Sequence, residues 1–387
     1  MAIQAKNGYG QRGSPVGTNR HKLAFHDLNY KQNSLKNKAI HIKGKEGKMN
    51  TFNETIKTML AVLVVANIAL FPNIAHSSEA KQDVTIQTVF GEGHIVTDMV
   101  EEFARQVRVF SDNRIKVTVR YGSPYGGVYE MSGQVARGLR EITTFVASSE
   151  IDPKLTIGFM GGLVSSYEEA EKVYGPNGPF MSLVNEIGAQ AGFKYIAWAP
   201  TGFGGIAFRD EAPEALPSPE TFKVRVAPVK SMEERYRSLG FNPVPMPYSE
   251  TYTALQTGAI DGKGATPPQE GFQDFGDITK VYVYSRDYFE AVVGIGVSLN
   301  WLNELTPEDR AAVERAGYGA TRFAWSVGEA TEREFLNKFR ESGVEVVEFS
   351  ADDYRRLNQL AQKSEWPIIE EIVGTAMMNR IRKMAQN

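Results

Sequence analysis

The alternation of strand-like and helix-like patterns after residue 80 is the feature that most limits the fold of this 387-residue chain. Short apolar-rich runs are separated by segments whose apolar residues recur every three or four positions, which is typical of helices. The strand-like runs lie at 84–90, 115–121, 141–149, 193–200, 204–209, 222–228 and 241–247. Strands that alternate with helices of this length indicate βαβ units and a parallel sheet. We therefore expect an α/β fold.

The C-terminal third is mainly helical. Thr306 is expected to cap a helix that has Pro307 in its first turn and extends to about residue 343. Such a helix is longer than most in globular domains, and we expect it to span two domains. No P-loop or dinucleotide-binding fingerprint is present, and the glycine-rich "TGFGGI" at 201–206 is interpreted as a hinge or tight turn.

The distribution of charged residues excludes nucleic acid as a partner. The first 80 residues contain 11 Lys and Arg but 4 Asp and Glu, whereas residues 81–387 contain 32 and 42. Binding to nucleic-acid phosphates depends on clustered basic residues, which this acidic body does not offer.

Histidine and cysteine usage excludes several kinds of site. Cysteine is absent, and His94 is the only one of five histidines after residue 80. A histidine-rich zinc site, a cysteine nucleophile and a disulfide framework are therefore excluded, and no GxSxG motif accompanies His94. We expect no metal and no cofactor, although oxygen-only cation sites remain open.

The N-terminal region predicts export. Met59–Phe71 is a thirteen-residue apolar run, shorter than the roughly 20 residues of a spanning helix, and Lys57 precedes it. We predict a cleavable signal peptide at 49–80, cut after Ala80 or in the alternative site at Ala75–Ser77. Residues 1–48 are polar and aperiodic, so we expect a disordered or non-native extension with translation starting at Met49. The alternative is a cytoplasmic tail on an uncleaved helix.

An arginine between two valines is the leading candidate for ligand binding. Arg225 lies in the strand-like "KVRVAP", which gives way at once to a helical pattern. Strand-to-helix junctions in α/β folds are where ligands bind, and a guanidinium matches a carboxylate with two parallel donors. The alternative from the residues alone is a strand-end arginine on the solvent face or paired with a structural acid.

The run "PMPYSETYTALQTGAIDG" at 245–262, which follows this strand, resembles the solute-binding proteins of TRAP transporters. Earlier segments, "GHIVTDMVEEFARQV", "NRIKVTVRYGSPYGG" and "VARGLREITTFVASS", fit the family in the same order, so the resemblance covers residues 81 to about 387. It implies a two-lobed periplasmic-binding-protein fold, with mixed sheets flanked by helices, a hinge and cleft between the lobes, and long C-terminal helices.

The resemblance implies domain limits as well as a function. Lobe I is expected at 81–202 plus 291–330, and lobe II at 203–290 plus 331–387, with hinges near 202 and 290. The implied function is periplasmic capture of an organic acid by lobe closure, with Arg225 pairing with the carboxylate, followed by delivery to the small and large subunits of a TRAP permease.

Further ligand contacts are expected in loops that face the cleft. The candidates are Glu92, His94, Tyr125, Ser148, Ser149, Phe203 and Thr266. For each of them a cap or packing role is the alternative.

The sequence departs from the family where relatives commonly read "DGQEN-P". Here the chain has "DGKGATPP", so Gly264 replaces a glutamate and Ala265 an asparagine, and Lys263 and Thr266 could substitute. These changes, with the aromatic residues of "YVYSRDYFE" at 282–290, favour a larger or partly apolar carboxylate.

Two other functions are open on the sequence. One is a binding protein for a sensor kinase or an ABC-type importer. The other is a periplasmic enzyme that uses Glu92 and His94, for which the sequence offers no nucleophile or metal.

Overall fold

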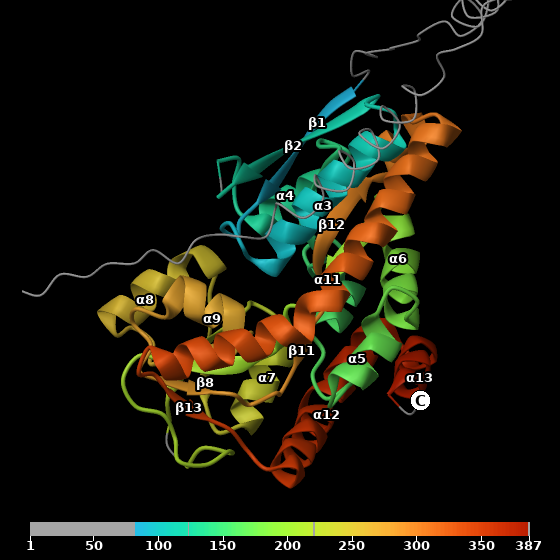
Figure 1. The fold of residues 1–387 in the computed structure, drawn as a ribbon. Helices are drawn as coiled ribbons and strands as arrows, with labels where there is room; N and C mark the ends of the chain where they lie inside the picture. Colours follow the sequence, from blue (N-terminus) through green and yellow to red (C-terminus); the bar gives the residue numbers. More distant parts are fainter. Residues whose placement is uncertain (1–81, 123, 220, 386–387) are drawn as a thin grey trace, which may run out of the picture. The chain divides into compact units, whose positions relative to one another are not determined.

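The computed structural model describes residues 82–122, 124–219 and 221–385 (Figure 1). The predicted extension and signal peptide lie outside these residues. Within the part described, no helix has both the length and the apolar character needed to cross a membrane.

The first sheet contains three strands in the order β3-β12-β4. The central strand β12 is antiparallel to both neighbours, so this sheet is not parallel as the alternation predicted. A separate pair, β1 and β2, is parallel. The bounds are β1 Gln82–Thr88, β2 Ile115–Tyr121, β3 Ile142–Val146, β4 Phe193–Ala199 and β12 Val293–Ser298.

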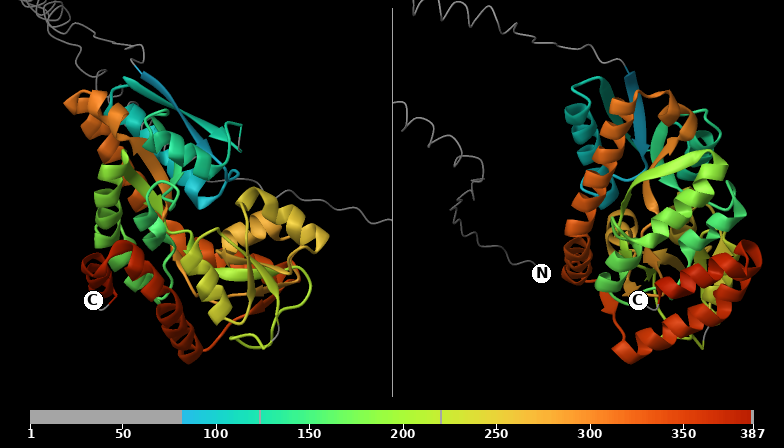
Figure 2. Two further views of the ribbon diagram at one scale, coloured as in Figure 1. Left: turned by 180° about the vertical axis from the view of Figure 1, so that it is seen from behind. Right: turned by 90° about the vertical axis from the view of Figure 1, so that its right-hand side faces the viewer.

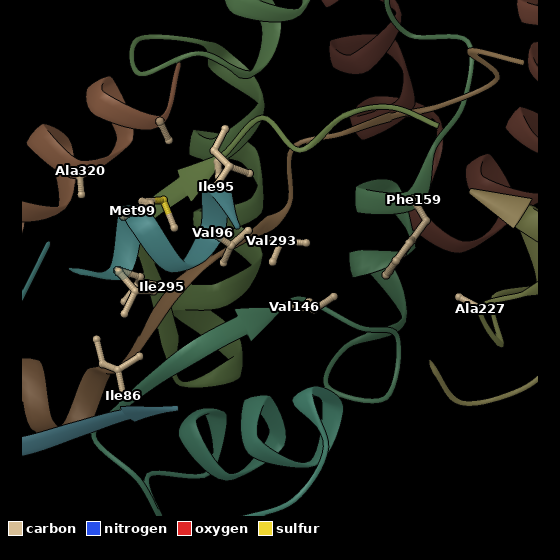
Figure 3. Close-up of a cluster of buried hydrophobic side chains, with 14 of the residues drawn as sticks. Ile86, Ile95, Val96, Met99, Val146, Phe159, Ala227, Val293, Ile295 and Ala320 are labelled. Carbon is tan, nitrogen blue, oxygen red and sulfur yellow. The ribbon is translucent and has the colours of Figure 1, made fainter. Parts of the chain in front are cut away.

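Helices from the first half of the chain accompany these strands. They are α3 Ile95–Phe110, α4 Val128–Ala136, α5 Tyr167–Tyr174 and α6 Pro179–Ala191, with a 3-10 helix, η1, at Pro153–Phe159. In α3 the apolar residues Ile95, Met99 and Phe103 recur every four positions and are buried, so one face of the helix packs on the core. Figure 3 shows Val96 and Met99 of this helix in the same apolar cluster as Ile295 of β12.

The second sheet has six strands in the order β13-β10-β6-β9-β7-β8. Strand β7 is parallel to β8 and β9, whereas β6 is antiparallel to β9 and β10. The strand bounds are β6 Gly205–Phe208, β7 Lys223–Val226, β8 Asn242–Pro245, β9 Gly262–Thr266, β10 Val281–Val283 and β13 Glu345–Val347. The accompanying helices are α7 Lys230–Ser238, the 3-10 helix η2 Tyr248–Glu250, α8 Thr251–Thr257 and α9 Pro268–Phe275.

A short antiparallel pair marks where the chain passes between the two sheets. Strand β5, Gly202–Phe203, follows β4 of the first sheet and precedes β6 of the second. Its partner β11, Phe289–Glu290, follows β10 and precedes β12. Both crossings therefore lie side by side, at the two positions where the sequence predicted hinges.

The C-terminal helices contact both halves. After α10, Leu299–Glu304, the 35-residue α11, Pro307–Glu341, packs on α3 and β4 and then on α9 and β13 (Figures 1 and 2). Thr306 caps it by accepting from the Asp309 N–H at 3.2 Å, as predicted. Helix α12, Ala351–Val373, packs on α7 and η1, and α13, Thr375–Met384, reaches α6.

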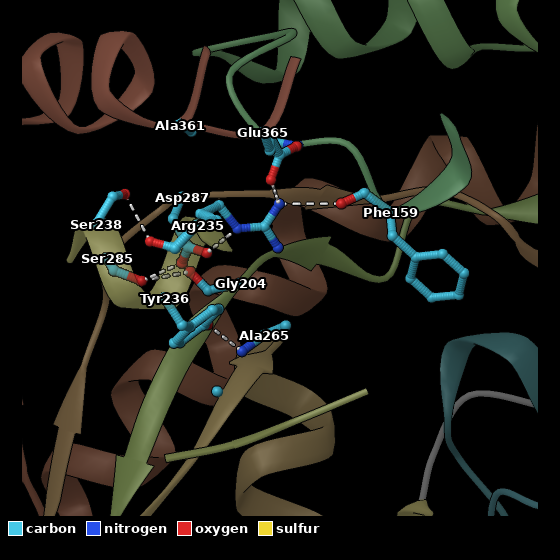
Figure 4. Close-up of polar contacts among 12 residues, drawn as sticks. Phe159, Gly204, Arg235, Tyr236, Ser238, Ala265, Ser285, Asp287, Ala361 and Glu365 are labelled. Carbon is cyan, nitrogen blue, oxygen red and sulfur yellow. Dashed lines mark hydrogen bonds and ion pairs between the residues drawn. The ribbon is translucent and has the colours of Figure 1, made fainter. Parts of the chain in front are cut away.

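A buried charge cluster, Arg235–Asp287–Glu365, joins these elements (Figure 4). Arg235 of α7 pairs with Asp287 at 3.1 Å and with Glu365 of α12 at 2.7 Å, and all three side chains are inaccessible to solvent. Its Nη1 also donates to the Phe159 carbonyl of η1 at 3.0 Å, and Glu365 accepts from the Gly161 N–H. The cluster thus links α7, α12 and the end of η1.

Candidate functional site

A cavity lies between the elements around the first sheet and the second sheet. Its volume is about 710 Å³ when the space that opens to solvent is included. Apolar side chains form most of its wall: Val89, Phe90, Val128, Val146, Phe159, Ala227, Met232, Ala265, Val292 and Val293. A mainly apolar pocket with a few polar groups is the usual form of a small-molecule site.

Arg225 lines this cavity from β7. Its side chain is nearly fully buried, with 4% of the residue exposed. Its neighbours Val224 and Val226 are fully buried on the opposite face of the strand. Its Nε and Nη2 donate to the Met246 carbonyl at 3.1 and 2.9 Å. Among the residues that the structure describes, the Nη1 donors and one Nη2 donor have no acceptor and are left for a ligand.

The charge of Arg225 is not matched by an ion pair. Among the described residues, no carboxylate lies within 4.0 Å of its guanidinium; the Tyr248 ring lies 5.8 Å away. Burial lowers the pKa of Arg225, which still remains charged because a guanidinium does not lose its proton in proteins. The site therefore presents a buried cation in a mainly apolar cavity.

Lys263 is the second cation of the cavity, one strand away. It lies on β9 opposite Arg225 in the register of the sheet. Its ammonium pairs with Glu270 of α9 and donates to the Ala265 carbonyl at 3.1 Å. Burial lowers the pKa of Lys263, and the nearby Glu270 opposes this effect.

Glu290 of β11 also lines the cavity. Its carboxylate accepts from the Thr201 hydroxyl at 2.6 Å and from the Tyr288 hydroxyl at 3.4 Å. Burial first, and then the negative charge of Glu270, raise the pKa of Glu290 to about 7. This carboxyl is therefore partly protonated near neutral pH.

The departure at Gly264 and Ala265 has a local cause. A Cβ on Gly264 would lie 2.4 Å from Cε1 of the buried Tyr236, so the tyrosine ring occupies the space that a side chain would need. The Tyr236 hydroxyl accepts from the Ala265 N–H. Ala265 has φ of 51° and lines the cavity with a methyl group.

Of the eight predicted site residues, Arg225 is the one found in the cavity lining. Thr266 is buried and donates to the Lys263 carbonyl at 3.0 Å. Phe203 is buried against Tyr167 and Phe289, with ring centroids at 5.9 and 4.8 Å.

The remaining five candidates do not line the cavity. Ser148 is buried beyond the end of β3, and its hydroxyl has no hydrogen-bond partner among the described residues; Ser149 is half-buried. Tyr125 and Glu92 are exposed. His94 caps α3, with Nδ1 accepting from the Val96 N–H at 3.2 Å, and burial lowers its pKa to about 3, so it is neutral.

The sequence reasoning missed Tyr129, Tyr248, Glu270 and Glu290, which all line the cavity. Glu270 comes shortly after the "GATPP" departure, and Glu290 ends the aromatic stretch at 282–290. Both residues therefore lie beside sequence features already connected with the ligand. Their positions depend on how β9, α9 and β11 pack together. Among the described residues, no group of three or more His, Asp or Glu side chains could hold a metal ion.

A family match covers residues 86–367, and the family is described as "Bacterial extracellular solute-binding protein, family 7". The chain belongs to this family. Its members are solute-binding receptors, so the resemblance predicted from the sequence is confirmed.

Relatives of the family-7 chain span nearly all of its described residues. A solute-binding protein of Albidiferax ferrireducens is 23% identical over 282 residues, 71% of this chain and 81% of the relative. The structure of the sugar acid binding protein DctPAm from Advenella mimigardefordensis, in complex with galactonate, superposes with a TM-score of 0.72 at 18% identity, over 80% of this chain and 99% of that one. A TRAP periplasmic solute binding protein from Desulfovibrio salexigens, with bound orotic acid, gives 0.71 at 19%, over 79% and 97%. These likenesses confirm the two-lobed α/β fold.

Proposed function

We propose that this family-7 protein captures an organic acid in the periplasm by closing its two lobes around it. It then delivers the acid to the small and large membrane subunits of a TRAP permease. Membership of the family supports the binding role. The two structural relatives named above were solved with galactonate and orotic acid, which are both organic acids.

The observation that carries the proposal is Arg225. A buried guanidinium without a carboxylate partner among the described residues is costly unless an anion compensates it. A ligand carboxylate would accept from the Nη1 and Nη2 donors in a charge-assisted pair, shielded from water by the apolar wall. The cavity thus matches one anionic group at a defined position.

Closure would bring the two sides of the cavity together. Lobe I, residues 81–202 plus 291–330, would contribute Phe90, Tyr129 and Phe159, and lobe II, residues 203–290 plus 331–387, would contribute Arg225. The crossings at β5 and β11 would act as the hinges. Ligand contacts present only in the closed state would stabilise that state.

Export would be directed by the signal peptide at 49–80. The apolar run and the small residues before position 81 support this assignment.

The proposal is tested with a thermal-shift screen of the purified protein, unfolded and refolded to remove bound ligand, against aliphatic, aromatic, keto and sugar acids. An acid present at 100 times its Kd adds about 2.7 kcal/mol to stability, which raises the melting temperature clearly. If no class of acid raises the melting temperature, the proposed function is overturned.

Substitution of Arg225 tests its role with the acid that the screen identifies. Arg225→Ala should weaken binding by about 2–4 kcal/mol, because the carboxylate would be buried without a partner. Arg225→Lys should also weaken it, because the planar donor pair is lost. Arg237→Ala, an exposed arginine of α7, is the control and should leave affinity unchanged. Calorimetric titration measures all three, and unchanged affinity in Arg225→Ala would remove this residue from the site.

A further inference from the structure

The two cations of the cavity, Lys263 and Arg225, differ in whether their charge is already paired with a carboxylate. Lys263 is already neutralised by Glu270, and its ammonium also donates to a backbone carbonyl. Arg225 has only a neutral carbonyl as its hydrogen-bond partner among the described residues. Arg225 is therefore left without an ion-pair partner among the described residues.

A second ligand carboxylate would meet carboxyl groups of the protein. To reach Lys263 it would have to displace Glu270, which is 7% exposed in its side chain and would be left buried without its counter-ion. Such a change is strongly unfavourable, because a buried charge that loses its partner keeps its desolvation cost. Glu290, which also lines the cavity, would add further repulsion whenever it is ionised.

A polyhydroxylated ligand would find few hydrogen-bond partners in the cavity. Three tyrosines line the cavity, but the Tyr248 hydroxyl already donates to Asp274 and the Tyr288 hydroxyl to Glu290. Tyr129, the Glu290 carboxyl and the acceptor lone pairs of the other two tyrosine hydroxyls are left as polar contacts for a ligand body, and the rest of the wall is mainly apolar. Each ligand hydroxyl buried without a partner weakens binding by about fivefold or more.

We propose that the Lys263–Glu270 ion pair and the apolar wall restrict this cavity to acids with a single carboxylate and a mainly apolar body. The inference rests on the proposed binding function and specifies its ligand class. Arg225 is the anchor for the carboxylate, and the ion pair acts as a specificity determinant that excludes dicarboxylates. The Phe90 and Phe159 rings, which both line the cavity, contact the ligand body.

A six-carbon series separates charge and polarity at constant length. Hexanoate has one carboxylate and an apolar chain, adipate has two carboxylates, and gluconate has one carboxylate and five hydroxyls. The panel also contains 4-methylpentanoate and phenylacetate, and calorimetric titration of the purified, ligand-free protein measures each Kd. We expect the best apolar monocarboxylate to bind at least tenfold more tightly than adipate and gluconate.

The outcomes separate this inference from the function on which it rests. If adipate or gluconate comes within tenfold of the best apolar acid, the inference is overturned and the binding function stands. If none of the five acids binds but the wider screen identifies another class of acid, the inference is overturned and the binding function again stands. Only the absence of binding to every acid in the wider screen would overturn both the inference and the proposed function.

Variants of the ion pair provide a second test. Glu270→Gln frees the charge of Lys263, so the ratio of adipate to hexanoate affinity should rise at least tenfold. The double variant Lys263→Met with Glu270→Gln removes the pair without leaving a buried charge. Its ratio of adipate to hexanoate affinity should rise less than in Glu270→Gln, because no cation is freed. Glu234→Gln, on the exposed side of α7, is the control.

If the single variant is too unstable to titrate, the five-acid panel on the parent protein decides the question alone. A loss of hexanoate affinity of more than tenfold in a folded double variant would mean that the pair holds the ligand itself. That result, or an unchanged ratio in Glu270→Gln, would overturn the inference.

Discussion

Arg225 lies between two valines because side chains alternate across a strand. Val224 and Val226 face the core on one side of β7, and Arg225 faces the cavity on the other. The same residue pattern would suit an arginine on a solvent-exposed face. What distinguishes this arginine is its burial together with a hydrogen bond to a neutral carbonyl, and both depend on neighbours far along the chain.

Gly264 offers a prediction at the scale of the residue. In Gly264→Ala the new methyl group would collide with the ring of Tyr236, so the free energy of unfolding should fall by about 1–3 kcal/mol. Gly91→Ala is the control, because no atom lies within 4 Å of the added Cβ, and its effect should stay within about 0.5 kcal/mol. Urea denaturation of the parent and both variants measures the difference. Equal stabilities would show that the Tyr236 ring can move aside.

Helix α11 connects the two halves at the scale of the element. Glu332, in the C-terminal half of this helix, accepts from the Phe203 N–H at 2.6 Å and from the Tyr167 hydroxyl at 3.2 Å, and also from the Tyr284 hydroxyl. These donors come from β5 at the first crossing, from α5 and from the loop after β10. One carboxyl of α11 therefore ties the helix to the region of the proposed hinges.

The pH dependence of stability tests this contact. Burial raises the pKa of Glu332 from 4.5 to about 7, so in the unfolded chain the carboxyl releases its proton at lower pH than in the folded protein. The folded state binds more protons between these values, and the free energy of unfolding contributed by Glu332 is lost as pH rises through about 7.

In Glu332→Gln this part of the pH dependence should disappear. The fall in the free energy of unfolding between pH 4.5 and pH 7.5 should become smaller than in the parent by on the order of 2–3 kcal/mol. Guanidinium denaturation at a series of pH values measures it, with the exposed Glu329→Gln of the same helix as the control. Parallel curves for the parent and Glu332→Gln would mean that Glu332 stays ionised in the folded protein.

The Arg235–Asp287–Glu365 cluster acts at the scale of the whole molecule. It connects α7, the segment before β11, α12 and the end of η1, which are separated by up to 204 positions in the sequence. Because these elements meet at groups that are all buried, loss of one partner affects the packing of several elements together.

Glu365→Gln should lower the global stability. It removes a buried charge opposite Arg235, and breaking such a pair costs about 3–5 kcal/mol in the free energy of unfolding. Glu186→Gln is the matched control, since Glu186 pairs with Arg380 at 2.7 Å on the surface, where a pair contributes at most about 1 kcal/mol. Equal losses in the two variants, measured by denaturant unfolding, would contradict the role of the cluster.

The sequence by itself indicated seven of the strands, the long helix, the family and the candidate anchor Arg225. Local patterns located these seven strands, up to residue 247, and the long helix with its Thr306 cap, because side-chain periodicity and capping act over a few residues. The strands after residue 247 were not predicted. The "PMPYSETYTALQTGAIDG" motif indicated the family, and Arg225 was found from its place beside that motif.

Only the tertiary structure decided the strand directions and the surroundings of the cavity. The antiparallel β12 comes from a distant part of the chain, and no local pattern specifies which neighbours it pairs with. Glu270 in the first turn of α9 pairs with Lys263 of β9, and His94 turns inward to cap α3. Burial and charge pairing are properties of distant groups brought together, so they arise only when the chain has folded.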